Sequence, residues 1–216
     1  MKFNDIPTEQ STAVTNVLVA LALIAIIIYL NRIGAKDRWK ANIWIATCAF
    51  LCLSVSVGAV VHGLQISAGL YMRLWQIIYL SLGLMMALFV VGVLYDLWGV
   101  QTAKRFLPIM IVVGFAFFCL TLIWPDNFMV FNLFQAVAML FSLSGYVGLA
   151  VRKKAQGAWL MSIGIVTLIT AAVVQATKAV SFTFILPFNH NGAYHLIALV
   201  GVTLIAFGIR KSLLAQ

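Results

Sequence analysis

Three histidines are the residues of this chain best suited to chemistry. His62 lies near the end of one long apolar segment, while His190 and His195 open the last one. Histidine changes charge near neutral pH, and its neutral ring nitrogens are favoured zinc ligands. A catalytic zinc holds three protein ligands and a water whose pKa falls to about 7, which suits attack on a carbonyl. Three histidines at one depth could supply that ligand set.

The spacing of the last two histidines limits how they could converge. His190 and His195 are five residues apart, so on a regular helix their side chains diverge by about 140°. Convergence therefore requires His190 to precede the regular helix, and the nearby Pro187 and Gly192 favour such an irregular start. Asn191 and His195, four residues apart, share a helix face instead.

The composition excludes a soluble globular protein. Of the 216 residues, 64% are hydrophobic and 9% are charged, whereas soluble domains are about 45–50% apolar and about 25% charged. The formal net charge of +9 would suggest nucleic acid in a soluble chain, so the placement of the basic residues decides its meaning. The three cysteines form no CxxC pair and lie in apolar stretches, which indicates packing rather than a metal site.

Seven long apolar segments predict an all-α, polytopic membrane protein with a single seven-helix domain over residues 1–216. Each has the roughly 20 residues that a bilayer core of about 30 Å requires. The predicted spans are 11–30, 41–63, 74–95, 106–124, 128–151, 157–177 and 187–209.

The basic residues alternate from side to side of these spans. Of the 14 Lys and Arg residues, 11 fall on one side, in the loops after the first, third and fifth spans and in the C-terminal tail. The positive-inside rule then places the N-terminus outside and the C-terminus in the cytoplasm. The positive charge would face anionic lipid headgroups, so we expect membrane lipids rather than nucleic acid as partners. A bacterial inner (plasma) membrane is the expected location.

Polar side chains gather at the same outer level as the histidines. Ionisable and amide groups inside a bilayer are costly, so an uneven distribution indicates a functional polar cavity open to the outside. The alternative is that these groups only hydrogen-bond between helices. Asp96, at the opposite membrane surface, is expected to cap a helix or reach the interface. The amides assigned to the cavity are Gln65, Gln76, Gln135, Gln175, Asn189 and Asn191.

The segment FNHNGAYHLIALVG at the start of the last span, with a histidine near the outer end of the second, resembles the CREST superfamily. This superfamily contains the alkaline ceramidases and the progestin/adipoQ receptors. The resemblance implies a seven-helix membrane hydrolase whose zinc is held by one histidine on helix two and two on helix seven. His62 and His195 match two of these ligands. Asn191 occupies the position of the third, with His190 displaced by one, and Gly58 stands where the family has a serine. The chain is also similar to uncharacterised bacterial membrane proteins that share the Asn-His-Asn motif.

Two functions follow as expectations. The first is a metal-dependent hydrolase of a lipid amide or ester, with Zn²⁺ held by His62, His190 and His195. The second is a non-catalytic membrane protein, either a lipid- or small-molecule-binding receptor or a transport subunit, whose histidines are structural. The family's aspartate near the start of helix three has no counterpart, so the sequence does not supply a general base.

Overall fold

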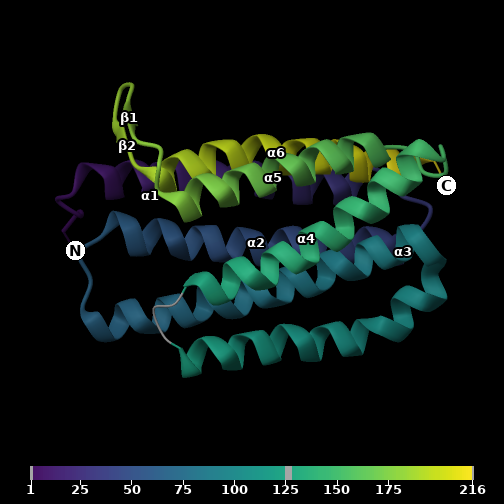
Figure 1. Ribbon diagram of the computed structural model, residues 1–216, viewed down its shortest axis with the longest axis horizontal. Coiled ribbons are helices and arrows are strands. Elements are labelled where there is room, and N and C mark those ends of the chain that lie inside the picture. The colour runs from purple at the N-terminus through teal and green to yellow at the C-terminus, as the bar shows by residue number, and fades with distance from the viewer. Residues whose placement is uncertain (1, 125–127, 216) are drawn as a thin grey trace.

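The computed structural model describes residues 2–124 and 128–215, and within these ranges the chain consists of helices, one short hairpin and the loops that connect them (Figure 1). All six helices are long and apolar enough to cross a membrane. They are α1 (Pro7–Arg32), α2 (Arg38–Gly63), α3 (Ala68–Ile123), α4 (Phe128–Val151), α5 (Ala158–Thr177) and α6 (His190–Leu214). The hairpin strands are β1 (Phe182–Thr183) and β2 (Pro187–Phe188).

Local sequence explains where several helices begin. Pro7 is the first residue of α1, where its missing N–H costs no hydrogen bond. Asp37, Ser67 and Asn189 cap α2, α3 and α6 through side chains that accept backbone N–H bonds. These boundaries make α1 and α2 a few residues longer than their predicted spans.

α3 contains the third and the fourth span that the sequence predicts, as two arms joined at a sharp bend. The spans expected at 74–95 and 106–124 both lie in it, because the residues between them remain helical except at Gly99. Gly99 has φ 83° and ψ 176°, a region open essentially only to glycine, and there the chain folds back (Figure 1). The two arms pack closely, since a Cβ on Gly83 would lie 2.7 Å from the carbonyl oxygen of Gly114. The third and fourth predicted spans therefore correspond to the two arms of α3.

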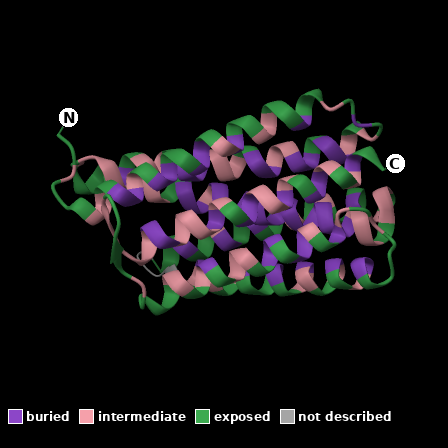
Figure 2. Ribbon diagram, turned by 90° about the horizontal axis from the view of Figure 1, so that it is seen from above, coloured by how far each residue is buried: buried purple, intermediate pink, exposed green. Residues whose placement is uncertain are grey.

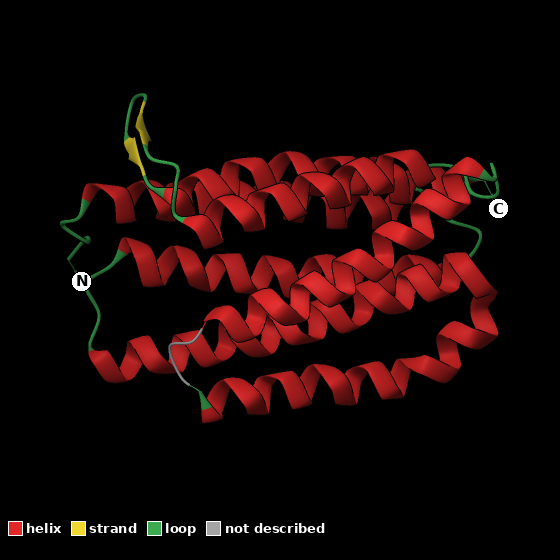
Figure 3. Cartoon of the chain, viewed as in Figure 1, coloured by secondary structure: helices red, strands yellow, loops and turns green. Residues whose placement is uncertain are grey.

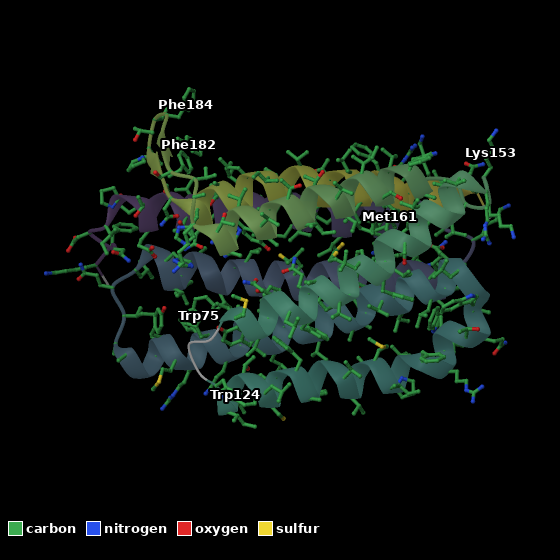
Figure 4. The ribbon with its side chains drawn as sticks, viewed as in Figure 1. Trp75, Trp124, Lys153, Met161, Phe182 and Phe184 are labelled. Atoms are coloured by element: carbon green, nitrogen blue, oxygen red, sulfur yellow. The ribbon has the colours of Figure 1, made fainter. Side chains whose placement is uncertain are left out.

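The helices form one bundle whose long axis follows the helix axes (Figures 1 and 3). α1 packs against α2 and α6, α2 against α3, α4 against α3 and α5, and α5 against α6. The N- and C-termini lie at opposite ends of the bundle (Figure 1). The end that carries the N-terminus and the hairpin is called the histidine end below. The end that carries Lys153 and the C-terminus is called the basic end (Figure 4).

The interior and the periphery of the bundle are both apolar. Inside, Trp44 packs edge-on against Phe89, and its ring lies so close to Gly92 that a Cβ there would be 2.5 Å away. Outside, exposed residues along the helices include large aliphatic side chains such as Val112 and Leu133, which are 67% and 68% exposed (Figure 2). An apolar surface on six membrane-length helices is consistent with an integral membrane protein.

Candidate functional site

A cavity of about 640 Å³ lies among the helices at the histidine end. Side chains from every helix of the bundle line it, and its wall is both polar and aromatic. The three histidines all contribute. Its titratable and amide lining includes Glu9, His62, Gln175, His190, Asn191 and His195.

His62 is paired with a carboxylate from another helix. Its Nδ1 lies 2.6 Å from Oε2 of Glu9, and the two side chains are 16% and 26% exposed. Glu9 belongs to the first turn of α1 and His62 to the last turn of α2. Among the described residues, Nε2 of His62 has no hydrogen-bond partner. A carboxylate on Nδ1 fixes the orientation and the tautomer of the ring.

The N-terminal segment holds Glu9 in place by crossing the end of α2. The backbone N–H of Asn4 donates to the Gly63 carbonyl at 2.9 Å, and the backbone N–H of Gln65 donates to the Lys2 carbonyl at 3.0 Å. The Asn4 side chain donates to the carbonyl of His62 itself at 3.1 Å. The chain before α1 is therefore hydrogen-bonded to the last residues of α2, which include His62, and to the loop that follows.

His195 is held by Asn16 of α1 rather than by a carboxylate. Nδ2 of Asn16 lies 3.0 Å from Nε2 of His195 and also donates to the Thr12 carbonyl at 3.0 Å. The Thr12 carbonyl can only accept a hydrogen bond, so the atom of the Asn16 side chain that faces it must be the NH₂ group. The same NH₂ group faces His195, and Nε2 of His195 must therefore accept. The neutral ring then carries its proton on Nδ1. Gly58 makes room for this contact, since a Cβ there would lie 2.9 Å from Oδ1 of Asn16.

His190 lies at the first position of α6, directly after its cap. Oδ1 of Asn189 accepts from the backbone N–H groups of Asn191 and Gly192 at 3.0 and 3.1 Å. The Asn191 side chain in turn accepts from Nε2 of Gln175 at 3.2 Å. Pro187 belongs to β2, so α6 starts later than the predicted span, but His190 is already helical. The irregular position that convergence with His195 requires is therefore absent.

The remaining predicted cavity amides are distributed over several places. Gln65 donates to Asp5 at 2.6 Å on the exposed surface, and Gln76 is exposed; neither lines the cavity. Asn189 is engaged as the cap of α6. Gln135 is buried and lines a second, deeper pocket. Gln175 and Asn191 line the cavity together with the histidines.

Sequence reasoning missed the contribution of α1. Glu9 and Asn16, the direct partners of two histidines, both come from this helix. A usable signal was the polar face formed by Ser11, Thr12 and Thr15, which are at most 2% exposed in an otherwise apolar helix. Polar residues at such helical spacing within a membrane span indicate a face directed into the bundle.

A narrower pocket of about 70 Å³ continues from the cavity toward the basic end. The two spaces share Tyr194 and His195, and α6 lines the deeper one as far as Ile209, about 22 Å further along the helix. Its wall is almost wholly apolar. Two exceptions are Gln135 and Nε1 of Trp44, a buried donor without a partner among the described residues.

A buried ionic network lies at the basic end. Nζ of Lys40 lies 2.6 Å from Oδ1 of Asp96, and the two side chains are 1% and 6% exposed. Tyr146 donates to Asp96 at 2.8 Å, and Lys40 donates to Ser212 at 2.6 Å. Asp96 therefore neither caps a helix nor reaches the interface as expected, because Lys40 from α2 meets it inside the bundle.

The cap of α2 adjoins this network. Tyr95 donates to Oδ2 of Asp37, and the Lys40 backbone N–H donates to Oδ1 at 2.9 Å. Burial raises the pKa of Asp37, but the bonds from Tyr95 and from the backbone amides of Trp39 and Lys40 outweigh burial and lower the pKa overall.

The donor set at the histidine end does not form a metal site as arranged. No three His, Cys, Asp or Glu side chains within residues 2–124 and 128–215 lie close enough together to hold an ion. His62 presents a free Nε2 with Glu9 behind it, which is the arrangement typical of a metal-binding histidine. His195 would have to release Asn16 before it could coordinate through Nε2.

Comparison with known proteins assigns the chain to a family. The model of a family of unknown function, DUF6962, matches residues 11–214. The chain belongs to this family. Neither the curated proteins nor the solved structures contain a match.

Proposed function

We propose that this DUF6962 protein binds a membrane amphiphile, with the polar end in the cavity and a single apolar chain in the deeper pocket. The supporting observation is that the polar cavity of about 640 Å³ and the narrow apolar pocket of about 70 Å³ adjoin at Tyr194 and His195. Amides and charged groups line the first, and aliphatic and aromatic side chains line the second. The unpartnered Nε1 of Trp44 favours a chain that carries a hydrogen-bond acceptor.

The Glu9–His62 pair supports hydrolysis of an amide or ester in the bound molecule. Glu9 accepts the proton of Nδ1, which leaves Nε2 of His62 as the base. Nε2 takes a proton from water as the water oxygen bonds to the carbonyl carbon. The same proton then passes to the leaving nitrogen or oxygen as its bond to that carbon breaks. His62, oriented by Glu9, thereby supplies the general base that the sequence alone did not.

Zinc held by His62, His190 and His195 is a further proposal, supported by the free Nε2 of His62. When bound, zinc would polarise the carbonyl and lower the pKa of a ligated water. Its binding requires His195 to turn away from Asn16, and it requires the first turn of α6 to unwind so that His190 can converge with His195. Metal analysis of detergent-purified protein tests this: about one zinc per chain, lost in His62→Ala, supports the proposal. Metal-free protein that still hydrolyses the substrate contradicts it.

The binding and hydrolysis proposals are tested together with two fluorescent single-chain probes, an N-acylethanolamine for the amide and a monoacylglycerol for the ester. We expect saturable binding in detergent micelles and release of the labelled fatty acid. Glu9→Gln removes the charge that orients His62, so we expect hydrolysis to fall about 10- to 100-fold with binding largely retained. Gln76→Ala, at the same end but outside the cavity, is the matched control and should leave both unchanged.

A binding protein without chemistry is the second candidate. The hydrogen bond from Asn16 to His195 favours it, because it gives that histidine a structural role. Saturable binding with no product, and no difference between Glu9→Gln and Gln76→Ala, would establish this candidate and reject hydrolysis. No saturable binding of either probe would reject both.

We also propose seven membrane crossings, with two contributed by the arms of α3. The supporting observations are the reversal at Gly99 and the position of the basic loop around Lys153 at the end opposite the histidines (Figure 4). By the positive-inside rule the histidine end then faces outward from a bacterial inner membrane, and the basic end faces the cytoplasm.

A further inference from the structure

The hairpin between α5 and α6 exposes large apolar side chains at its tip. Phe184 and Ile185 are 81% and 84% exposed, more than any other large hydrophobic residue described. The rest of the hairpin is ordered around them: Phe182 stacks on Phe188 across the strands, with ring centroids 5.0 Å apart. Its base is fastened to α1 by a bond from Oγ of Ser11 to the Pro187 carbonyl at 2.7 Å. The tip is therefore held away from the bundle by structure beneath it.

The hairpin stands across the helix axes at the histidine end (Figures 1 and 3). Phe184 extends beyond the layer of α5 and α6, outside the perimeter of the bundle (Figure 4). If the helices span a bilayer, this position is the interface between headgroups and acyl chains, beside the lipid-facing surface of α5 and α6. Val173 near the end of α5 is 54% exposed, so this end of the helix also presents an apolar side chain at the surface.

The composition of the segment agrees with that position. Residues 179–189 contain no charged side chain and include three phenylalanines. A protein partner would need about 800 Å² on each side for a stable interface, which a tip of two exposed side chains does not provide. Amphipathic and aromatic side chains at this depth are typical membrane anchors.

We propose that the hairpin tip, Phe184 and Ile185, inserts into the lipid leaflet at the histidine end and anchors the rim of the cavity. The hairpin joins Lys178 and His190, which both line the cavity. Lipid insertion of the tip therefore fixes the depth at which the cavity meets the membrane. This inference does not depend on the proposed hydrolysis.

The test places a single environment-sensitive label on the tip. Phe184→Cys is made in a chain whose three cysteines are replaced by alanine, labelled with the fluorophore NBD, and reconstituted in vesicles. The vesicles contain equal parts of phosphatidylcholine and phosphatidylglycerol, with or without a lipid carrying a nitroxide near the top of its acyl chain. We expect blue-shifted emission, protection from aqueous iodide, and nitroxide quenching several-fold stronger than at the control position. Lys2→Cys, exposed at the same end, is that control.

Two results would overturn the proposal. Iodide quenching as strong at position 184 as at position 2 would place the tip in water. Protection from both iodide and the nitroxide lipid would show that protein covers it. Ile185→Trp in the otherwise unchanged chain, read by quenching with a brominated lipid, gives an independent readout should the cysteine-free chain fail to fold.

Discussion

At the scale of single residues, His62 and His195 differ in their hydrogen-bond partners. His62 faces a carboxylate that can accept a proton from Nδ1, whereas His195 faces an amide that donates to Nε2. A histidine bonded to a carboxylate is prepared for proton transfer or coordination, and one that accepts from an amide is fixed as a neutral ring. In the hydrolysis proposed above, the reactive role therefore belongs to His62.

The tautomer of His195 is a direct prediction. Nitrogen-15 NMR of ring-labelled protein should show the Nδ1–H tautomer, because Nδ2 of Asn16 donates to Nε2. Asn16→Asp replaces that donor with an acceptor, so the ring should change to the Nε2–H tautomer. Gln175→Glu makes the same chemical change beside Asn191 and should leave His195 unaffected. An Nε2–H signal in the unmodified protein would contradict the hydrogen bond.

The site residues that the sequence predicted are of types that rarely occur in a membrane span. Three histidines in apolar segments met that condition, and the structure places all three on one cavity. The partners of two of these histidines were not predicted, because Glu9 and Asn16 lie 53 and 179 residues from the histidines they contact. Contacts of that separation depend on which helices pack together, and hydropathy does not contain that information.

At the scale of elements, apolar length predicted membrane-crossing helices but not how they connect. The bend in α3 depends on one residue, Gly99, inside a stretch that otherwise favours helix. The β1–β2 hairpin was likewise absent from the prediction, since its strands have only two residues each and their apolar side chains resemble the start of a span.

Gly99→Ala tests the bend. The φ of 83° and ψ of 176° at this position are strained for any residue with a Cβ, so we expect a loss of about 1–3 kcal/mol in the free energy of unfolding. Denaturant titration in detergent micelles measures the loss. Gly148→Ala is the matched control: it lies inside α4 with nothing within 4 Å of the added Cβ, and should be neutral or stabilising by up to about 1 kcal/mol. Equal effects of the two changes would contradict the strained bend.

At the scale of the whole molecule, the two ends of the bundle use their charges in opposite ways. At the histidine end Glu9 and His62 remain partly exposed to a large cavity. At the basic end Lys40 and Asp96 are buried and bonded to Tyr146 and Ser212. The network joins α2, α3, α4 and α6, and the deeper pocket ends above it. The large cavity therefore lies at the histidine end, and the ionic network lies at the other end, outside the lining of both pockets.

The last prediction concerns how much the Lys40–Asp96 pair stabilises the basic end of the bundle. Removing one partner leaves a buried charge without its counter-charge, so Lys40→Met and Asp96→Leu should each lower the free energy of unfolding by about 3–5 kcal/mol. The double variant removes both charges, and its loss should be far smaller than the sum of the two single losses. Denaturant titration in the same micelles gives all four values of this double-mutant cycle.

The double-mutant cycle also distinguishes a buried ion pair that stabilises the fold from a pair that water screens. Additive losses would mean that the two charges do not interact, contrary to their separation of 2.6 Å and burial. Small single losses would mean that water reaches the network and screens it, as it does for surface pairs worth about 0–1 kcal/mol. A strong coupling would mean that one desolvated contact holds α2 and α3 together at the basic end. Lys40 and Asp96 would then have a structural role, unlike the partly exposed Glu9 and His62 at the cavity.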